Sequence, residues 1–536
     1  MCILLYIHTM SISNLLNNNN NLLNEKSLQF QSENTNIELI PILNAKFGIL
    51  KLTAVSAPMS KEVNEFIFMV DRSGSMSDMC SDGRDKMQHI LHTLQNMIIY
   101  FKDNSANVYI NIFTFDDTIC EVVERTVINE TNLNSIIAKI KTITPRASTN
   151  IEKALIIIKH TINKIRLNNP THNISNIFMT DGVATDGNCD ISYLYELVDR
   201  NITNAFIGFG LEHDATLLNS ISNGDKSDYY FIDKLENSGL VYGEILHGIL
   251  YKVLTNVSIE CSNCFIYDYK NNIWCKSLKL SDITSESNKV YHVISCTPND
   301  CNVFLKTESN QDGYLVQNGY SIFKEESNCD LSKYVFRQRT LQLLYKINKF
   351  INRNNSQKNY DVLLDFEDIP IDNNSVIKHE KDALRNEIKC FMGEMKKYMN
   401  DNNLNNDGIM KNLCDDIYIS YRTFGTKFGA MYTVARQNSQ GTQRVYTVSY
   451  TPNEIYNNLD TSRCIPPQLT RQTNRDNISN LSSPLGDLIH GDDNDSDDDD
   501  GMNHVLSNFQ ESPYLTPSIT QVMRDVSIGT EWLPIY

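Results

Sequence analysis

The 536-residue chain lacks any long hydrophobic run. Its apolar stretches, such as Phe66–Val70, have the length of a strand, whereas a membrane-spanning helix requires roughly 18 apolar residues or more. The apolar start Met1–Ile7 lacks the basic residues with which a signal peptide begins, and no small-residue cleavage site follows it. We therefore expect neither a signal peptide nor an association with membranes.

An excess of positive charge is also missing. Lysine and arginine number 48 against 65 aspartates and glutamates, and the net charge is −17. This balance argues against non-specific binding of nucleic acid and leaves cations and basic proteins as partners. The 13 cysteines are odd in number and scattered, so no dense disulfide framework is expected. Such cysteine usage is typical of a reduced, intracellular protein, and we expect a cytoplasmic location.

The common catalytic motifs are absent from the sequence. It contains no P-loop, no glycine-rich dinucleotide turn and no His-Glu-x-x-His. None of the 11 histidines stands in an evident nucleophile–base pair. We therefore expect a protein that is not an enzyme.

Changes in residue pattern divide the chain into six parts. Strands alternate with amphipathic helices in the third part and recur about every 30–40 residues, which favours a mostly parallel sheet with helices on both faces. The fourth part alternates with period two, as antiparallel strands do. The parts are a disordered N-terminal segment (1–37), two short strands (38–57), an α/β domain (58–255), an antiparallel β domain (256–325), a helical region (326–429) and a largely disordered tail with an acidic run (430–536).

Oxygen-bearing side chains gather after the first strand of the α/β domain. Asp71, Ser73 and Ser75 follow Phe66–Val70 directly, and Gly74 allows a tight turn between the serines. The carboxyl end of a parallel strand opens onto the ligand-binding edge of its sheet. Hard cations such as Mg²⁺ prefer oxygen ligands. Two hydroxyls supply little negative charge, so such a site would keep positions open for water or another carboxylate.

Two further segments lead to the same edge. Thr149 lies where a loop enters the helix predicted from Asn150, and Asp181 follows the strand predicted over 173–179. The hydroxyl of Thr149 and the carboxylate of Asp181 are thus predicted near the first loop.

These segments together resemble the von Willebrand factor type A (VWA) domain. The resemblance rests on DRSGSM (71–76), STNIEKAL (148–155), FMTDG (178–182) and AFIGFG (205–210), in this order. It implies a Rossmann-like fold and a metal-ion-dependent adhesion site, or MIDAS, which binds a divalent cation. The site residues that it implies are Asp71, Ser73, Ser75, Thr149 and Asp181.

The resemblance also implies roles for these residues. Ser73, Ser75 and Thr149 would contact the metal directly, whereas Asp71 and Asp181 would act largely through water and hydrogen bonds. The cation would be Mg²⁺, or another divalent ion such as Mn²⁺ or Ca²⁺. A protein partner would offer an Asp or Glu carboxylate to the vacant coordination position.

The flanks of the domain resemble a narrower group of intracellular proteins from bacteria, plants and large DNA viruses. In that group a β-sandwich brackets the VWA domain, so the strands of 38–57 would join those of 256–325. A viral origin would add the virion as a location. The alternatives that stay open are a ubiquitin-ligase-like or other enzyme-complex subunit, and a structural viral protein.

Some residues allow two interpretations. The group Cys261, Cys264, Cys275, Cys296 and Cys301, with His292 nearby, could bind structural zinc, but strand cysteines are more often ordinary core residues. Arg72 is expected to be solvated, and Asp116 and Asp117 to form a turn or to support the site. Tyr432–Tyr450 could be a docking motif or a strand added to a partner's sheet.

Overall fold

The computed structural model describes twelve stretches of the chain. They are residues 3–11, 46–54, 56–80, 82–104, 107–233, 235–295, 302–307, 310–318, 331–361, 372–426, 428–445 and 512–528. The chain forms two compact units. The first unit contains residues 1–338, 438–446 and 514–536, and the second contains 339–437 and 447–513.

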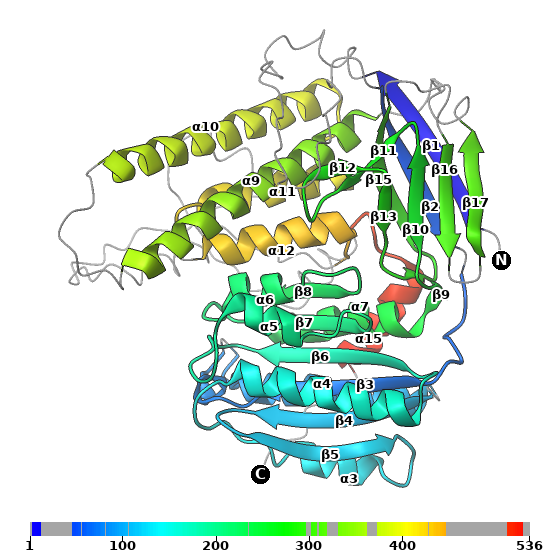
Figure 1. Ribbon diagram of the computed structural model, residues 1–536, viewed down its shortest axis with the longest axis vertical. Coiled ribbons are helices and arrows are strands. Elements are labelled where there is room, and N and C mark those ends of the chain that lie inside the picture. The colour runs from blue at the N-terminus through cyan, green and yellow to red at the C-terminus, as the bar shows by residue number, and fades with distance from the viewer. Residues whose placement is uncertain are drawn as a thin grey trace, which may run out of the picture. The chain divides into compact units, whose positions relative to one another are not determined.

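A six-stranded sheet forms the centre of the α/β domain in the first unit (Figure 1). Its strand order is β5-β4-β3-β6-β7-β8, and every neighbouring pair is parallel except β4 and β5. All eight residues of β3 are buried, as expected for a parallel strand covered on both faces. The strands are β3 (Asn64–Asp71), β4 (Val108–Phe115), β5 (Ile119–Val127), β6 (Asn173–Thr180), β7 (Thr203–Phe209) and β8 (Ser227–Ile232).

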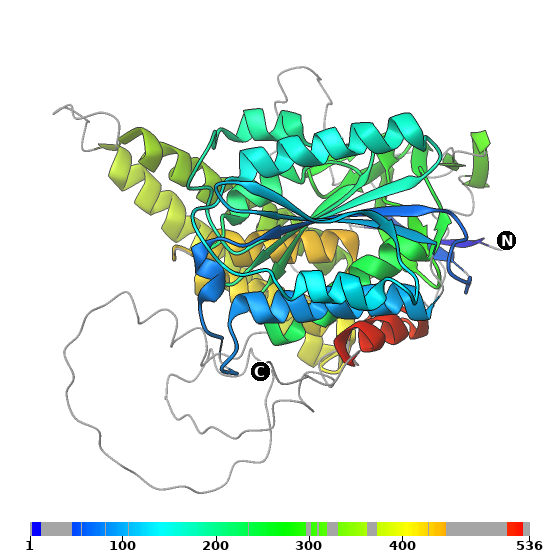
Figure 2. The ribbon, with the colours of Figure 1, turned by 90° about the horizontal axis from the view of Figure 1, so that it is seen from below.

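Helices cover both faces of this sheet, as Figure 2 shows. Most begin at a residue whose side chain caps the first turn. Asp85, for example, accepts a hydrogen bond from the Gln88 amide in a capping box at the start of α2, and the Asn150 side chain caps α4 by accepting one from the Lys153 amide. The helices are α2 (Lys86–Asp103), α3 (Leu133–Ile140), α4 (Ile151–Asn168), α5 (Ile191–Leu197), α6 (Ala215–Ile221) and α7 (Ser238–Leu250).

Antiparallel strands from both sides of the α/β domain form a β-sandwich. One sheet has the order β1-β2-β15-β11-β12 and the other β13-β10-β16-β17. Apolar residues of both sheets share a core, among them Leu52, Ile259 and Val293. A small two-stranded sheet pairs β9 (Lys252–Leu254), which follows α7 in the chain, with β14 (Ile283–Thr284). The sandwich strands are β1 (Ile3–Ser11), β2 (Lys46–Ala54), β10 (Ser258–Ser262), β11 (Phe265–Asp268), β12 (Ile273–Cys275), β13 (Ser277–Lys279), β15 (Asn288–Ser295), β16 (Asn302–Thr307) and β17 (Asn310–Asn318).

Four long helices follow the sandwich in the chain. Within the second unit, Leu341, Leu344 and Ile347 of α9 are buried, as are Ile388 and Met395 of α10. The helices are α9 (Ser332–Asp361), α10 (Asp372–Asp401), α11 (Gly408–Thr423) and α12 (Gly429–Thr442). The predicted fold class is therefore confirmed for a mostly parallel α/β domain, antiparallel sheets and a helical region. None of the helices in the described parts of the chain has the length and apolarity that crossing a membrane requires.

The N-terminal segment differs from the prediction of disorder for residues 1–37. Residues 3–11 form β1, which pairs with β2 in antiparallel register from Ile3 opposite Ala54 to Ser11 opposite Lys46. The prediction is wrong for these residues because their partner strand follows more than 30 residues later in the chain, and a local pattern does not show such a pairing. Residues 12–45 lie outside the described part of the chain.

The C-terminal part also contains more structure than predicted for residues 430–536. Tyr432–Thr442 is helical, so the prediction of a strand is wrong for this segment. Arg444 is buried, donates a hydrogen bond to the Tyr229 carbonyl at 2.7 Å and lies 3.4 Å from Asp228. A hydrophobicity pattern cannot reveal docking through buried polar groups. The acidic run 491–501 lies outside the described residues.

A last helix, α15 (Pro517–Ile528), packs on α7 and α2 within the first unit. Gly239 and Gly243 of α7 face its backbone, so the two helices approach closely. Asn96 of α2 donates a hydrogen bond to the Val526 carbonyl at 2.9 Å. A segment that the chain reaches only near its end thus belongs to the α/β domain.

Two alanine substitutions in α7 test this docking. A Cβ at Gly243 would lie 2.5 Å from the Cα of Met523, whereas a Cβ at Gly248 would meet nothing within 4 Å. Gly243→Ala is expected to lower the free energy of unfolding by about 1–3 kcal/mol because α15 must shift. Gly248→Ala should raise it by up to about 1 kcal/mol through helix propensity. Calorimetric unfolding of the full chain measures both, and equal effects would contradict the docking.

Candidate metal centre

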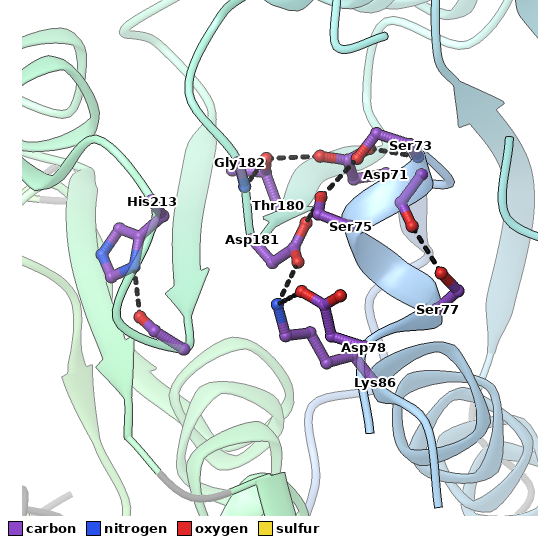
Figure 3. Close-up of polar contacts among 12 residues, drawn as sticks. Asp71, Ser73, Ser75, Ser77, Asp78, Lys86, Thr180, Asp181, Gly182 and His213 are labelled. Carbon is purple, nitrogen blue, oxygen red and sulfur yellow. Dashed lines mark hydrogen bonds and ion pairs between the residues drawn. The ribbon is translucent and has the colours of Figure 1, made fainter. Parts of the chain in front are cut away.

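The carboxyl ends of β3 and β6 bring two of the predicted site loops together. The strands pair in parallel up to Val70 opposite Met179, so Asp71 and Asp181 leave the sheet at one edge (Figure 3). After Asp71 the chain turns into the short 3₁₀-helix η2 (Gly74–Ser77), which carries Ser75.

Ser73, Ser75 and Asp181 form a continuous chain of oxygen atoms. The Ser75 hydroxyl donates a hydrogen bond to Asp181 Oδ1 at 2.8 Å, and the hydroxyls of Ser73 and Ser75 lie 3.1 Å apart. Ser73 and Asp181 are buried. The two hydroxyls and the carboxylate thus share one small volume, although Ser75 and Asp181 are 106 residues apart in the chain.

Asp71 orients the loop from beneath. Its Oδ1 accepts a hydrogen bond from the Ser73 amide at 2.8 Å, and its Oδ2 accepts one from the Thr180 hydroxyl at 2.6 Å. Burial raises the pKa of Asp71 to about 7, although the hydrogen bonds from Thr180 and Ser73 oppose this rise. Because protein donors use both oxygens of Asp71, its role is to position the serine loop. The motif analysis missed Thr180, which directly precedes Asp181.

Thr149 reaches the same place from the loop before α4. A Cβ built on Gly182 would lie 3.1 Å from the Thr149 hydroxyl and 3.8 Å from the Ser75 hydroxyl, so both oxygens face this glycine. Thr185 holds the threonine in place, since its hydroxyl accepts from the Thr149 amide at 2.9 Å and its amide donates to the Thr149 carbonyl at 3.0 Å. The structure therefore brings all five predicted residues to one edge of the sheet.

The loop that carries Thr149 has a strained backbone. Ala147 has a φ of 58°, a left-handed conformation that L-residues other than glycine rarely adopt. In this conformation the Ala147 carbonyl accepts a hydrogen bond from the Gly74 amide at 3.0 Å. The hydrogen bond that this strained conformation allows thus joins the threonine loop to the serine loop.

Asp116, at the end of β4, joins the same two loops by charge. It is buried, and its Oδ2 lies 2.8 Å from Arg72 Nε and 2.6 Å from Arg146 Nε. Burial alone would raise the pKa of Asp116, but hydrogen bonds from Arg146 and Thr118 hold it below its usual value. Both interpretations of Asp116 are correct. Its carboxylate accepts a hydrogen bond from the Thr118 amide in a turn, and its ion pairs with Arg72 and Arg146 support the site. The interpretation of Arg72 as solvated is wrong, because this ion pair leaves its side chain only 15% exposed.

Lys86, at the start of α2, is a site residue that the motif analysis missed. Its Nζ lies 2.7 Å from Asp181 Oδ2 and 2.9 Å from Asp78 Oδ2 (Figure 3). Burial alone would lower the pKa of Lys86, but these two carboxylates raise it. His213 is buried, its two ring nitrogens lie within hydrogen-bond distance of the Gly210 carbonyl and the Tyr229 hydroxyl, and burial lowers its pKa to about 4. Lys86 lies in an irregular loop-to-helix junction, where no periodic pattern could have marked it.

The donor set fits a hard divalent cation. Three hydroxyls and two carboxylates offer oxygen ligands only, which suits Mg²⁺, Mn²⁺ or Ca²⁺.

The alternative zinc group does not assemble among the described residues, where no three histidine, cysteine or acidic side chains lie together as a metal site. Cys261 and Cys264 pack in the core of the sandwich, and burial raises the pKa of Cys275 to about 11, which disfavours the thiolate. Cys296 and Cys301 lie outside the described residues.

Comparison with known families gives one match. Residues 65–242 match the family model of the von Willebrand factor type A domain. Comparison with curated proteins gives no significant match.

Comparison with solved structures gives several similar chains. A von Willebrand factor type A protein from Catenulispora acidiphila is 14% identical, with a TM-score of 0.42 over 58% of this chain and 78% of that one. The ArnB paralog VWA2 from Sulfolobus acidocaldarius is 13% identical, with a TM-score of 0.42, and the match covers 74% of this chain and 94% of that one. Proximal thread matrix protein 1 from the mussel byssus, solved with a zinc-occupied MIDAS motif, is 17% identical, with a TM-score of 0.30. That match covers 38% of this chain and 51% of the other.

The strained loop yields a stability prediction. Ala147→Gly should raise the free energy of unfolding by about 1 kcal/mol, because glycine adopts a positive φ without the clash that alanine suffers. Ala184→Gly, in the neighbouring loop at an ordinary backbone angle, should leave stability unchanged or lower it by up to about 1 kcal/mol. Denaturant unfolding of both variants measures the difference. Destabilisation by Ala147→Gly would show that the left-handed turn is not intrinsic to this loop.

Proposed function

Residues 65–242 are a von Willebrand factor type A domain, and on this premise we propose that the chain is a metal-dependent protein-interaction module. Ser73, Ser75 and Thr149 would hold a divalent cation, with Asp71 and Asp181 in support. Mg²⁺ is the first candidate, followed by Mn²⁺ and Ca²⁺. The bound cation would supply a positively charged coordination position for an Asp or Glu carboxylate of a partner protein.

The observation that carries this proposal is the convergence of the five side chains. The Ser75 hydroxyl bonds to Asp181, the Ser73 hydroxyl lies beside it, and Thr149 faces the same glycine. The three hydroxyls are neutral, so these proposed direct ligands would leave the charge of a divalent cation uncompensated. A site of this kind favours an additional anionic ligand, which a partner's carboxylate would provide.

The surroundings of the site suit a protein ligand. Met79 and Val183 lie on the loops that carry Ser75 and Asp181, and they are 67% and 48% exposed. Exposed apolar side chains beside a polar centre are common at protein interfaces. We therefore propose a partner whose carboxylate is flanked by apolar residues, rather than a nucleic acid or a membrane.

We also propose that the chain is not an enzyme and that it acts inside the cell, in the cytoplasm, or in the virion if its origin is viral. The absence of catalytic motifs and the scattered cysteines of the sequence support these two points. Fractionation of the producing cells and of purified particles would test the location.

Magnesium titration tests the metal site directly. Thr149→Ala should weaken Mg²⁺ binding about tenfold or more, since it removes a hydroxyl ligand without a change in charge. Ser77→Ala is the matched control. It also removes one hydroxyl, from the helix η2 that carries Ser75, but this hydroxyl donates to the Gly74 carbonyl and is not a proposed ligand. Isothermal titration calorimetry should give Ser77→Ala the wild-type affinity. Equal Mg²⁺ affinity in both variants would contradict the proposed ligand set.

Capture of partners from lysate tests the bridging role. The wild-type chain with Mg²⁺ should retain a partner that EDTA releases and that Asp71→Ala and Thr149→Ala fail to retain. The comparison is made by quantitative mass spectrometry of eluates from parallel columns. A partner retained unchanged in EDTA would show that the metal does not bridge the two proteins, even though the fold is correct.

A further inference from the structure

Lys86 places a positive charge inside the candidate metal centre. Its side chain is only 13% exposed, and its ammonium group lies between two carboxylates of different character. The Asp181 side chain is fully buried, whereas that of Asp78 is 61% exposed. The lysine therefore connects an interior carboxylate with one that faces solvent (Figure 3).

The loop before α2 returns the chain to the site and fixes this position. The Lys86 amide donates to the Asp78 carbonyl at 3.1 Å, and the Cys80 amide donates to the Arg84 carbonyl at 2.7 Å. Lys86 is also the first residue of α2 after the capping residue Asp85. A cation is electrostatically unfavourable at a helix N-terminus, so the two carboxylates offset a placement that the helix itself disfavours.

Both carboxylate oxygens of Asp181 take part in this arrangement. Ser75 donates to its Oδ1, and Lys86 pairs with its Oδ2 at 2.7 Å. A divalent cation beside Ser75 would lie next to the ammonium group, and like charges at such a separation repel strongly at low dielectric. Asp78 offers the ammonium group a second carboxylate that it already contacts.

We propose that Lys86 is a tethered cation that competes with the metal: it pairs with Asp181 when the centre holds no ion and moves toward Asp78 when an ion binds. This inference rests on the proposed function of the site. Its consequence is a centre that stays ordered without metal and that binds metal weakly and reversibly. Lys86 would thus set the affinity of the site without being a ligand.

Calorimetric titration of the full chain with Mg²⁺ and Mn²⁺ tests the competition. Lys86→Met should bind both ions about tenfold or more tightly than wild type, because the repulsion is lost. Lys86→Arg, which keeps the charge, should bind them no more tightly than wild type. The matched control is Lys153→Met, which removes an exposed ammonium group that donates to the Asp117 carbonyl near the same edge, and it should leave both affinities within about twofold of wild type.

A double-mutant cycle separates the role of Asp78 from simple charge attraction. Asp78→Asn should weaken metal binding in the wild-type background, because the displaced ammonium group loses its alternative partner. The same substitution should have little effect in the Lys86→Met background. An equal loss in both backgrounds would show that Asp78 acts on the metal directly, and would overturn the proposed movement.

Chemical labelling of the wild-type chain provides a test that needs no variant. Reductive methylation of Lys86, followed by mass spectrometry, should be faster in Mg²⁺ than in EDTA, with Lys153 as the internal reference. Unchanged or slower labelling of Lys86 would overturn the inference, as would Lys86→Met binding metal no more tightly than wild type. If neither wild type nor Lys86→Met binds either ion, the proposed function fails first and the competition fails with it.

Discussion

The parallel register of β3 and β6 is the constraint on which the candidate site depends. Val70 lies opposite Met179, so the loops that follow the two strands start next to each other. Neighbouring strands are separated by about 4.8 Å, which is close enough for the hydrogen bond from Thr180 to Asp71 and for that from Ser75 to Asp181. A shift of one residue would turn these side chains to the other face of the sheet.

The third loop is held against the first two by strain and by buried charge. The left-handed Ala147 and the ion pairs of Asp116 with two arginines both act on the segment that presents Thr149. Strained backbone and buried charge cost stability, and they persist where the surrounding structure fixes them. Their concentration beside one cluster of oxygen atoms is consistent with a site arranged in advance for a ligand.

Much of this architecture could be predicted from the sequence. Strand and helix periodicity indicated the α/β domain, and the ordered motifs identified all five oxygen-bearing residues. Lys86 could not be found in this way because its partner Asp181 is 95 residues distant. The same holds for β1, whose partner strand lies beyond residues 12–45, and for Arg444, whose burial depends on polar contacts. Such features arise from tertiary pairing, which leaves no local pattern.

The most direct measurement of the central claim is the position of a bound ion. A crystal of the chain grown or soaked in Mn²⁺ would locate the metal by its anomalous scattering. The account predicts a single strong peak within ligand distance of the Ser73, Ser75 and Thr149 hydroxyls, with the Lys86 ammonium group withdrawn from Asp181. A peak elsewhere, or an empty centre with Lys86 still paired to Asp181 at saturating Mn²⁺, would contradict it.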